Sequence, residues 1–380
     1  MGGSRDRDVA ARATYVAYDP DVTSPSRVDY LDGLRAVAIA AVLGVHWAAL
    51  YIGIGSGGYL GVDVFFVLSG YVITTVLWRS SSSGTVGSRW RTFIWRRVRR
   101  LYPALLALVV LTPIAIAVTP DPPVDVRDTV ERGALAAVQL TWLPEVFGHS
   151  MEPYRQTWSL AMEWYFYLLW PAVVLAARSR GLAARTLARH SVVAAVVLYA
   201  AMLPWSGRVF YGTPPARFAE ILAGAALALA LVDRTTERPG GRASNLLATT
   251  ALLAIGVYVL LAPWGYLETP VRYVGVPLAV AATLVLVLHG LTSGTSPVKR
   301  LLTWAPVTLL GRVSYSLYLW HWLPLYLLDK DSIDLPVGLL AVLGVGLTVI
   351  LTTVSYLLLE RPFMSSQASK LRARPQEANA

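Results

Sequence analysis

Apolar segments of about 20 residues recur along this chain, and they constrain its fold more than any other feature, because about 20 apolar residues of helix cross a bilayer. Only 15% of the residues are charged and 55% are hydrophobic, whereas soluble domains carry about 25% charged residues. The pattern predicts an all-α, polytopic membrane helix bundle. Its ten expected spans are 34–53, 59–78, 101–118, 158–177, 191–205, 217–232, 246–262, 272–290, 305–328 and 336–359.

Arginine and lysine residues predict the orientation of these spans. With the N-terminus inside the cell, the cytoplasmic segments carry 24 of the 33 basic residues, the outer loops carry 5, and four lie within or at the ends of spans. This bias favours two cytoplasmic termini and a multi-pass protein of the cell membrane. We expect polar tails at 1–28 and 364–380 around a transmembrane domain at 29–363. The apolar stretch 133–147 contains Pro144 and Glu145, so we expect it to be re-entrant or interfacial on the outer side.

The composition also limits the partners. The net charge of +10 is expected from the basic loops of a membrane protein, so we expect the lipid bilayer and no nucleic acid as a partner. The chain has no cysteine, which excludes disulfides, thiolate metal sites and a cysteine nucleophile, and we expect no metal. The first 28 residues contain no apolar core of a signal peptide, so the first apolar helix is expected to act as the insertion signal.

The first span carries two residues that are costly in a bilayer, Arg35 and His46. Eleven residues separate them, which is about 16 Å of helix and about three turns, so both side chains point to one face. A structural interpretation is an arginine that reaches the cytoplasmic interface and a histidine bonded to a neighbouring carbonyl. A functional interpretation is a path that leads from a cationic end to a reactive imidazole.

Other ionisable residues are expected in the outer half of the membrane, where a carboxylate beside a histidine could form a general base. Two of them have structural alternatives. Arg217 and Glu220 are three residues apart and could pair with each other, and His321 could bond across helices. The residues expected to converge are His46, Asp63, Glu163, Glu220 and His321.

The inner side is strongly basic. Seven arginines and no acidic residue occupy 79–100, and four of the arginines fall within 96–100. Such a segment could lie on anionic lipid. It could equally bind a polyphosphate, because guanidinium groups bind phosphate oxygens through two parallel hydrogen bonds.

Taken in order, these segments resemble the acyltransferase-3 family of integral membrane O-acyltransferases, bacterial enzymes that acylate polysaccharides and antibiotic sugars. The resemblance covers about residues 28–363. One departure stands out: the family often has Glu-Glu in the fourth motif, and here the second position is Trp164. The matching stretches are LDGLRAVAIAAVLGVHW, GYLGVDVFFVLSGYVI, WRRVRRLYPALL, TWSLAMEWYFYLLWP, RFAEILAGAALAL and GRVSYSLYLWHW, followed by SYLLLERP.

The resemblance implies acyl-CoA, most simply acetyl-CoA, as a donor from the cytoplasm, and a hydroxyl of a carbohydrate or glycosylated metabolite as acceptor. An alcohol that attacks a thioester must lose its proton, so we expect neutral His46 to act as general base, with Glu163 holding its tautomer or stabilising the imidazolium. The alternative is a transient acyl-histidine. The competing interpretation is a proton-coupled transporter, because buried His and Glu also serve proton relays. The implied catalytic residues are His46, Glu163 and Asp63, the implied donor-binding residues are Arg35, Arg97, Arg100 and Tyr102, and the implied acceptor-binding residues are Arg217, Glu220, His321 and Trp158.

Overall fold

A computed structural model describes residues 25–48, 53–80, 84–119, 122, 124–232, 241–263, 265, 267–328 and 333–363. Within these ranges every regular element is a helix, and seven helical segments are long and apolar enough to cross a membrane. The expected all-α, polytopic bundle is therefore confirmed. Residues 1–24 and 364–380, which make up most of the two expected tails, lie outside the described residues.

The seven candidate spans coincide with seven of the ten expected ones. Several combine a regular helix with a short π-helical or 3-10 turn at one end, as in α2 (Pro25–Leu43), which continues into the π-helix η2 (Gly44–Ala48). The spans are Asp29–Ala48, Ser56–Arg79, Val86–Val118, Arg155–Ser179, Arg242–Leu261, Val271–Thr292 and Val337–Phe363.

The other three expected spans are also helical, but they are shorter or broken. The fifth and sixth correspond to α9 (Ala184–Met202) and α11 (Pro214–Ala230), of 19 and 17 residues. The ninth, 305–328, is not one helix but three, because the chain leaves helical geometry at Val313 and turns again at His321. Its pieces are α15 (Ala305–Arg312), α16 (Ser314–Trp320) and α17 (Trp322–Leu327).

The stretch 133–147 does not form a spanning helix. It falls on the end of α6 (Val126–Ala137) and on α7 (Trp142–Val146), which have 12 and 5 residues. Neither length crosses a hydrocarbon core of about 30 Å. The remaining short elements are η3 (Ser56–Tyr59), η4 (Arg155–Thr157), α10 (Gly207–Gly212), η5 (Val271–Gly275), α14 (Pro297–Leu302) and η6 (Tyr356–Glu360).

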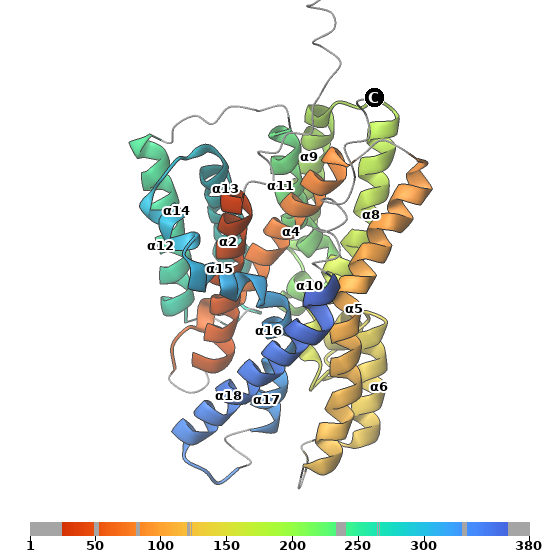
Figure 1. Cartoon of the computed structure of the whole chain (residues 1–380), viewed down its shortest axis with the longest axis vertical. Helices are drawn as coiled ribbons and strands as arrows, with labels where there is room; N and C mark the ends of the chain where they lie inside the picture. The colour runs from red at the N-terminus through yellow and green to blue at the C-terminus, as the bar shows by residue number, and fades with distance from the viewer. Residues whose placement is uncertain are drawn as a thin grey trace, which may run out of the picture.

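The helix α4 (Leu60–Arg79) lies at the centre of the bundle, with 72% of its apolar window buried. It packs against α2, α8 (Trp158–Ser179), α11 and α13 (Val276–Thr292) (Figure 1). Small residues bring α4 and α11 together: a Cβ on Gly70 would lie 1.8 Å from the carbonyl oxygen of Ile221, and one on Gly224 would lie 1.9 Å from that of Val67. Close backbone contact of this kind is how helices associate in lipid.

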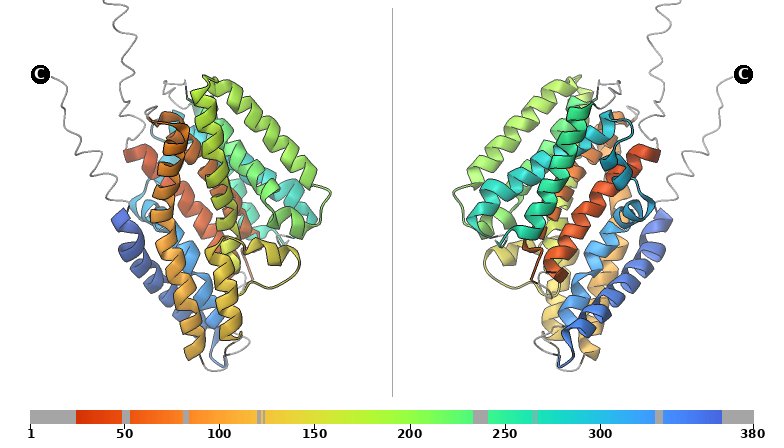
Figure 2. Two further views of the ribbon diagram at one scale, coloured as in Figure 1. Left: turned by 90° about the vertical axis from the view of Figure 1, so that its right-hand side faces the viewer. Right: turned by 90° about the vertical axis from the view of Figure 1, so that its left-hand side faces the viewer.

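Peripheral helices expose large apolar side chains, as lipid-facing surfaces do. In Figure 1, α5 (Val86–Val118) forms one edge of the bundle and α12 (Arg242–Leu261) the other, and Figure 2 shows α5, α6 and α18 (Val337–Ser355) extending beyond the other helices at one end. Val110 on α5, Leu253 on α12 and Val349 on α18 are each more than half exposed. This surface would be unstable in water and fits a bilayer.

Candidate functional site

Two cavities lie in the bundle, separated by one layer of side chains. The same helices line both: α4 gives Phe65 to the inner cavity and Val62 to the outer one, and α16 gives Tyr315 to the inner cavity and Tyr318 to the outer one. Three residues are about one helical turn, so side chains on successive turns of α4 and α16 form the partition between the two cavities. The rings of Phe65 and Tyr318 meet edge to face across it, with centroids 6.4 Å apart.

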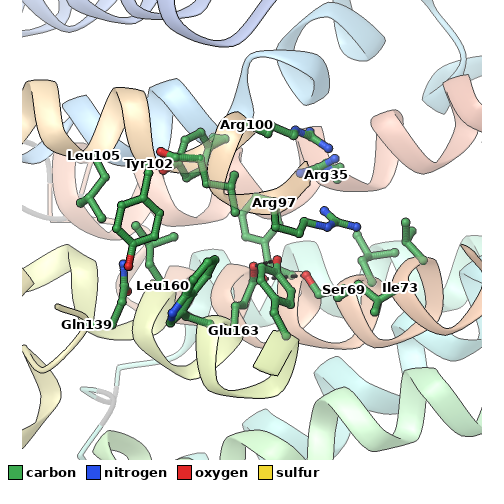
Figure 3. A pocket seen from close by; sticks show the side chains of 17 residues that line it. Arg35, Ser69, Ile73, Arg97, Arg100, Tyr102, Leu105, Gln139, Leu160 and Glu163 are labelled. Carbon is green, nitrogen blue, oxygen red and sulfur yellow. Dashed lines mark hydrogen bonds between the residues drawn. The ribbon is translucent and has the colours of Figure 1, made fainter. Parts of the chain in front are cut away.

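Three arginines converge on the inner cavity, which has a volume of about 100 Å³. Arg35 comes from α2, whereas Arg97 and Arg100 come from α5 and lie on one face because three residues separate them (Figure 3). Within the described part of the chain, none of the three guanidinium groups forms an ion pair. The inner cavity therefore presents three guanidinium groups that lack ion-pair partners in the described chain, together with one carboxylate, that of Glu163.

The surroundings of these arginines hold them without neutralising them. The Arg97 guanidinium lies 5.3 Å from the ring centroids of both Phe93 and Tyr167. The Nε atom of Arg100 is buried and, among the described residues, has no hydrogen-bond partner. The nearest acidic neighbour of Arg100 is Glu360, which is buried at the end of η6 and accepts a hydrogen bond from Ser316.

Glu163 lies in the inner cavity and not beside His46, which corrects the expected partnership of these two residues. Its carboxylate accepts hydrogen bonds from the Ser69 hydroxyl at 2.6 Å and from the Tyr167 hydroxyl at 2.5 Å (Figure 3). The helix α8 turns this face toward α4 and α5, away from the imidazole. Beside it, Trp164 packs against Tyr102 with ring centroids 5.0 Å apart, so an indole stands where the family often has a second carboxylate.

Tyr102, which the family resemblance implied as a donor-binding residue, also lines the inner cavity. Its hydroxyl faces the side chain of Gln139 (Figure 3). The backbone of Gln139 has φ 63°, in the left-handed region, and its carbonyl accepts a hydrogen bond from Tyr165 at 2.7 Å. The segment after α6 is thereby fixed against the cavity wall.

His46 lies on the wall of the outer cavity, whose volume is about 420 Å³. It belongs to the π-helical turn η2, a local irregularity that is frequent at functional sites. Its Nδ1 is 3.0 Å from Nε2 of His321, and the two rings stack with centroids 5.0 Å apart. Trp322 packs edge-on against His46 at 4.7 Å. His46 and Arg35 therefore open onto different cavities and not onto one continuous path.

Aromatic side chains and one unpaired amide oxygen line the rest of the outer cavity. Trp142, Trp158 and Trp322 are among its lining residues. Gln156 is only 3% exposed; its Nε2 donates to the carbonyl of Leu319 at 3.1 Å, while its Oε1 has no partner within the described residues. A buried, unpaired acceptor at a cavity wall suits a ligand that donates a hydrogen bond.

The outer mouth of this cavity carries a charged group of three residues. Arg155 lies 3.7 Å from Glu145 and 3.6 Å from Glu152, and Trp322 donates to Glu152. Burial raises the pKa of Glu145 to about 7, although the positive charge of Arg155 opposes this change. Burial also raises the pKa of Glu152, against the hydrogen bond from Trp322 and the charge of Arg155.

Asp63, Arg217 and Glu220 form a separate cluster inside the bundle. Arg217 lies 2.6 Å from Asp63 and 3.0 Å from Glu220, and all three side chains are at most 1% exposed. The guanidinium also packs over the ring of Tyr211, 4.4 Å from its centroid. None of the three lines either cavity. The structure therefore favours the pairing alternative for Arg217 and Glu220 and adds Asp63, which joins α4 to α11.

The sequence missed several residues that line the cavities. Most lie in the segment between α6 and α8, where no helical period assigns a face, or close to motif residues that were themselves predicted as site residues. The missed residues of the inner cavity are Ser69, Gln139, Tyr167 and Tyr315, and those of the outer cavity are Trp142, Glu145, His149, Arg155, Gln156, Arg208, Tyr318 and Trp322.

Comparison with known proteins identifies the family of this chain. A family described as an acyltransferase domain matches residues 28–360. The chain is 31% identical over 353 residues to YrhL of Bacillus subtilis, named as a candidate peptidoglycan O-acetyltransferase; the match covers 87% of this chain and 54% of that protein. It is 29% identical over 358 residues to the peptidoglycan O-acetyltransferase OatA of Listeria monocytogenes, covering 88% of this chain and 55% of the relative.

A third relative is the O-acetyltransferase OatA of Staphylococcus aureus, 26% identical over 366 residues, with 89% of this chain and 57% of the relative covered. The chain thus spans 54–57% of the length of these curated relatives. No solved structure gives a significant match to it.

Proposed function

Because this chain belongs to the acyltransferase-3 family, we propose that it is a membrane O-acyltransferase that moves an acyl group from acyl-CoA to a hydroxyl of a carbohydrate or glycosylated metabolite. One observation carries the proposal. Three guanidinium groups without ion-pair partners in the described chain face a cavity whose wall residue Phe65 packs against Tyr318, on the wall of the cavity that His46 lines.

The inner cavity suits a polyanionic donor from the cytoplasmic side. Uncompensated buried cations are costly, and phosphate oxygens offset that cost through bidentate, charge-assisted hydrogen bonds. We assign the CoA phosphates to Arg35, Arg97 and Arg100. The narrow remainder of the cavity admits a linear arm, and the 16 Å or so of helix between Arg35 and His46 matches a donor whose thioester lies far from its phosphates.

The outer cavity suits a sugar acceptor. It combines tryptophan faces with a few polar groups, as sites for neutral polar ligands do. The unpaired Oε1 of Gln156 can accept a hydrogen bond from one hydroxyl, while a second hydroxyl lies at His46. The relatives named above as peptidoglycan O-acetyltransferases make glycan hydroxyls the first acceptors to test.

The reaction needs one proton acceptor at the junction of the two cavities. In the proposed step His46 takes the proton of the acceptor hydroxyl as its oxygen bonds to the thioester carbonyl carbon. The carbon–sulfur bond then breaks, and the departing CoA sulfur takes the proton from the imidazolium. The products are an ester and CoA thiol, and the acyl end of the donor passes between Phe65 and Tyr318 to reach the site.

The test uses the full chain, purified in detergent, with radiolabelled acetyl-CoA and N-acetylglucosamine oligosaccharides or a glycosylated macrolide as acceptors. We expect CoA thiol release that requires both an acceptor and His46, and loss of transfer in His46→Ala. His190→Ala, at an exposed position on α9, is the matched control and should retain activity. Full transfer by His46→Ala would refute the assignment. Label bound to protein without an acceptor would identify an acyl-histidine, and solute uptake into vesicles without acyl-CoA would identify a transporter instead.

A further inference from the structure

We infer that His321 is a positioning residue that fixes the tautomer of His46 and leaves the Nε2 atom of His46 bare for the acceptor hydroxyl. The catalytic consequence rests on the proposed function, whereas the direction of the hydrogen bonds rests on geometry alone. His321 does not line the outer cavity, so the acceptor-binding role expected for it is replaced by a role behind His46.

The direction of the chain of hydrogen bonds begins at a backbone carbonyl. Nδ1 of His321 lies 2.7 Å from the carbonyl oxygen of Tyr318. A carbonyl oxygen only accepts hydrogen bonds, so Nδ1 of His321 carries a hydrogen. A neutral imidazole has a single N–H group, which leaves Nε2 of His321 as an acceptor.

His321 is neutral because nothing near it compensates a charge. Its side chain is fully buried, and its described polar contacts are the backbone carbonyls of Tyr318 and Leu317 and the His46 ring. The acidic groups described at this end, Glu145 and Glu152, both pair with Arg155, and Glu152 also accepts from Trp322. A second proton on His321 would place an unpaired charge in the bundle, which is strongly unfavourable.

The second hydrogen bond then has only one possible direction. Nε2 of His321 is 3.0 Å from Nδ1 of His46, and because the former is bare, the latter must donate. His46 therefore carries its hydrogen on Nδ1. The backbone carbonyl of Val42 also accepts from the His46 ring, which has a single N–H group while it is neutral. With that hydrogen on Nδ1, the Nε2 atom is unprotonated, and the side chain lines the outer cavity. This is the state that a general base requires before it takes a proton.

The same contact helps after proton transfer. When His46 becomes an imidazolium, its Nδ1–H bond to His321 becomes charge-assisted and roughly twice as strong. A buried carboxylate holds and stabilises the base in this manner in Ser-His-Asp triads. Here an imidazole backed by a carbonyl occupies that place, so Glu163 is not needed beside His46.

The variants are chosen by the atom that each offers to His46. In His321→Gln, the side-chain carbonyl oxygen can reach the place of Nε2 and accept the hydrogen bond. In His321→Leu, the volume is filled but no acceptor is left. His289→Gln is the matched control, because His289 is also buried and fully hydrogen-bonded, to Ser244, Ser293 and Ser296, but lies outside both cavities.

The first readout is the nitrogen NMR spectrum of the full chain in nanodiscs with 15N-labelled histidine, with His46 signals assigned by their loss in His46→Ala. We expect an Nδ1–H tautomer for His46 in the parent, in His321→Gln and in His289→Gln, and its loss in His321→Leu. An Nε2–H tautomer in the parent, or an unchanged tautomer in His321→Leu, would overturn the inference.

The second readout is steady-state transfer from acetyl-CoA to N-acetylglucosamine oligosaccharides. In His321→Leu we expect kcat to fall about ten- to hundredfold, the usual effect of losing a hydrogen bond to a charged group, with KM for acetyl-CoA unchanged. In His321→Gln most of kcat should return. Equal loss of kcat in both variants at unchanged melting temperature would contradict the positioning role. If the parent protein has the Nδ1–H tautomer of His46 but transfers no acetyl group, the hydrogen-bond assignment stands and the proposed function is rejected.

Discussion

Two pairs of arginines on one helix allow a direct test of donor binding. Arg97 and Arg100 face the inner cavity, whereas Arg96 and Arg99 on the same turns of α5 are exposed. Changing either pair to glutamine removes two positive charges from the same part of α5 and keeps polar, unbranched side chains. Any effect on topology or on anionic lipid should therefore be equal in the two double variants.

The expected change in KM follows from the absence of ion pairs to either guanidinium group in the described chain. Because Arg97 and Arg100 have no ion pair in the described chain, removing them breaks no ion pair, although the buried Glu360 loses the opposite charge of Arg100 nearby. What is lost is binding: about 1.5–3 kcal/mol for each charge-assisted bond to a phosphate. A single cavity variant should raise KM for acetyl-CoA about tenfold or more, and additive effects give about a hundredfold in the double variant.

The assay is CoA thiol release by purified protein over a range of acetyl-CoA concentrations, with protein quantified by fluorescence-detected size exclusion. The exposed pair should leave KM within about threefold of the parent. A cavity-pair variant that changes only protein abundance, or an exposed-pair variant with the same rise in KM, would refute the assignment of the phosphates to these side chains. Lysine at Arg97 and Arg100 should recover part of the affinity, because it keeps the charge but not the bidentate geometry.

Three further outcomes follow from other groups. Arg217→Met leaves Asp63 and Glu220 without their buried counter-ion, so the free energy of unfolding in detergent should fall by about 3–5 kcal/mol. Gln156→Leu removes the unpaired acceptor in the outer cavity and should raise KM for the sugar acceptor about tenfold while KM for acetyl-CoA is unchanged. Because the pKa of Glu145 is raised from 4.5 to about 7, the folded state binds more protons than the unfolded state between these values. Stability should therefore fall as pH rises through that window, by about 3 kcal/mol relative to Glu145→Gln in thermal unfolding.

The membrane fold was predictable because lipid imposes a simple rule on sequence. Each spanning helix must form the hydrogen bonds of its own backbone groups, so its length and apolar content can be read from the amino-acid sequence. The ninth expected span shows the limit of that rule. Residues 305–328 are predominantly apolar, yet they form three short helices, because a segment buried among other helices can satisfy its backbone groups through neighbours.

Within one helix the sequence also predicted which side chains lie together. The three-residue spacing of Arg217 and Glu220 allowed the two to pair, and the structure places them 3.0 Å apart. The sequence did not predict which side chains of different helices meet, because spacing along a chain does not give the rotation of one helix against another. Glu163 was expected beside His46 on depth alone, but α8 turns it toward Ser69 and Tyr167.

The unpredicted part of the site is concentrated where helices lose their regular geometry. His46 lies in the π-helical turn η2, Glu360 ends the π-helical turn η6, and His321 lies at the junction of α16 and α17. A 3.6-residue period assigns a face only in a regular helix, so it cannot say where a side chain points after such a turn. At His321 the break leaves the Tyr318 carbonyl to accept from the ring. The irregular turn thus provides the acceptor from which the direction of the whole His321–His46 hydrogen-bond chain follows.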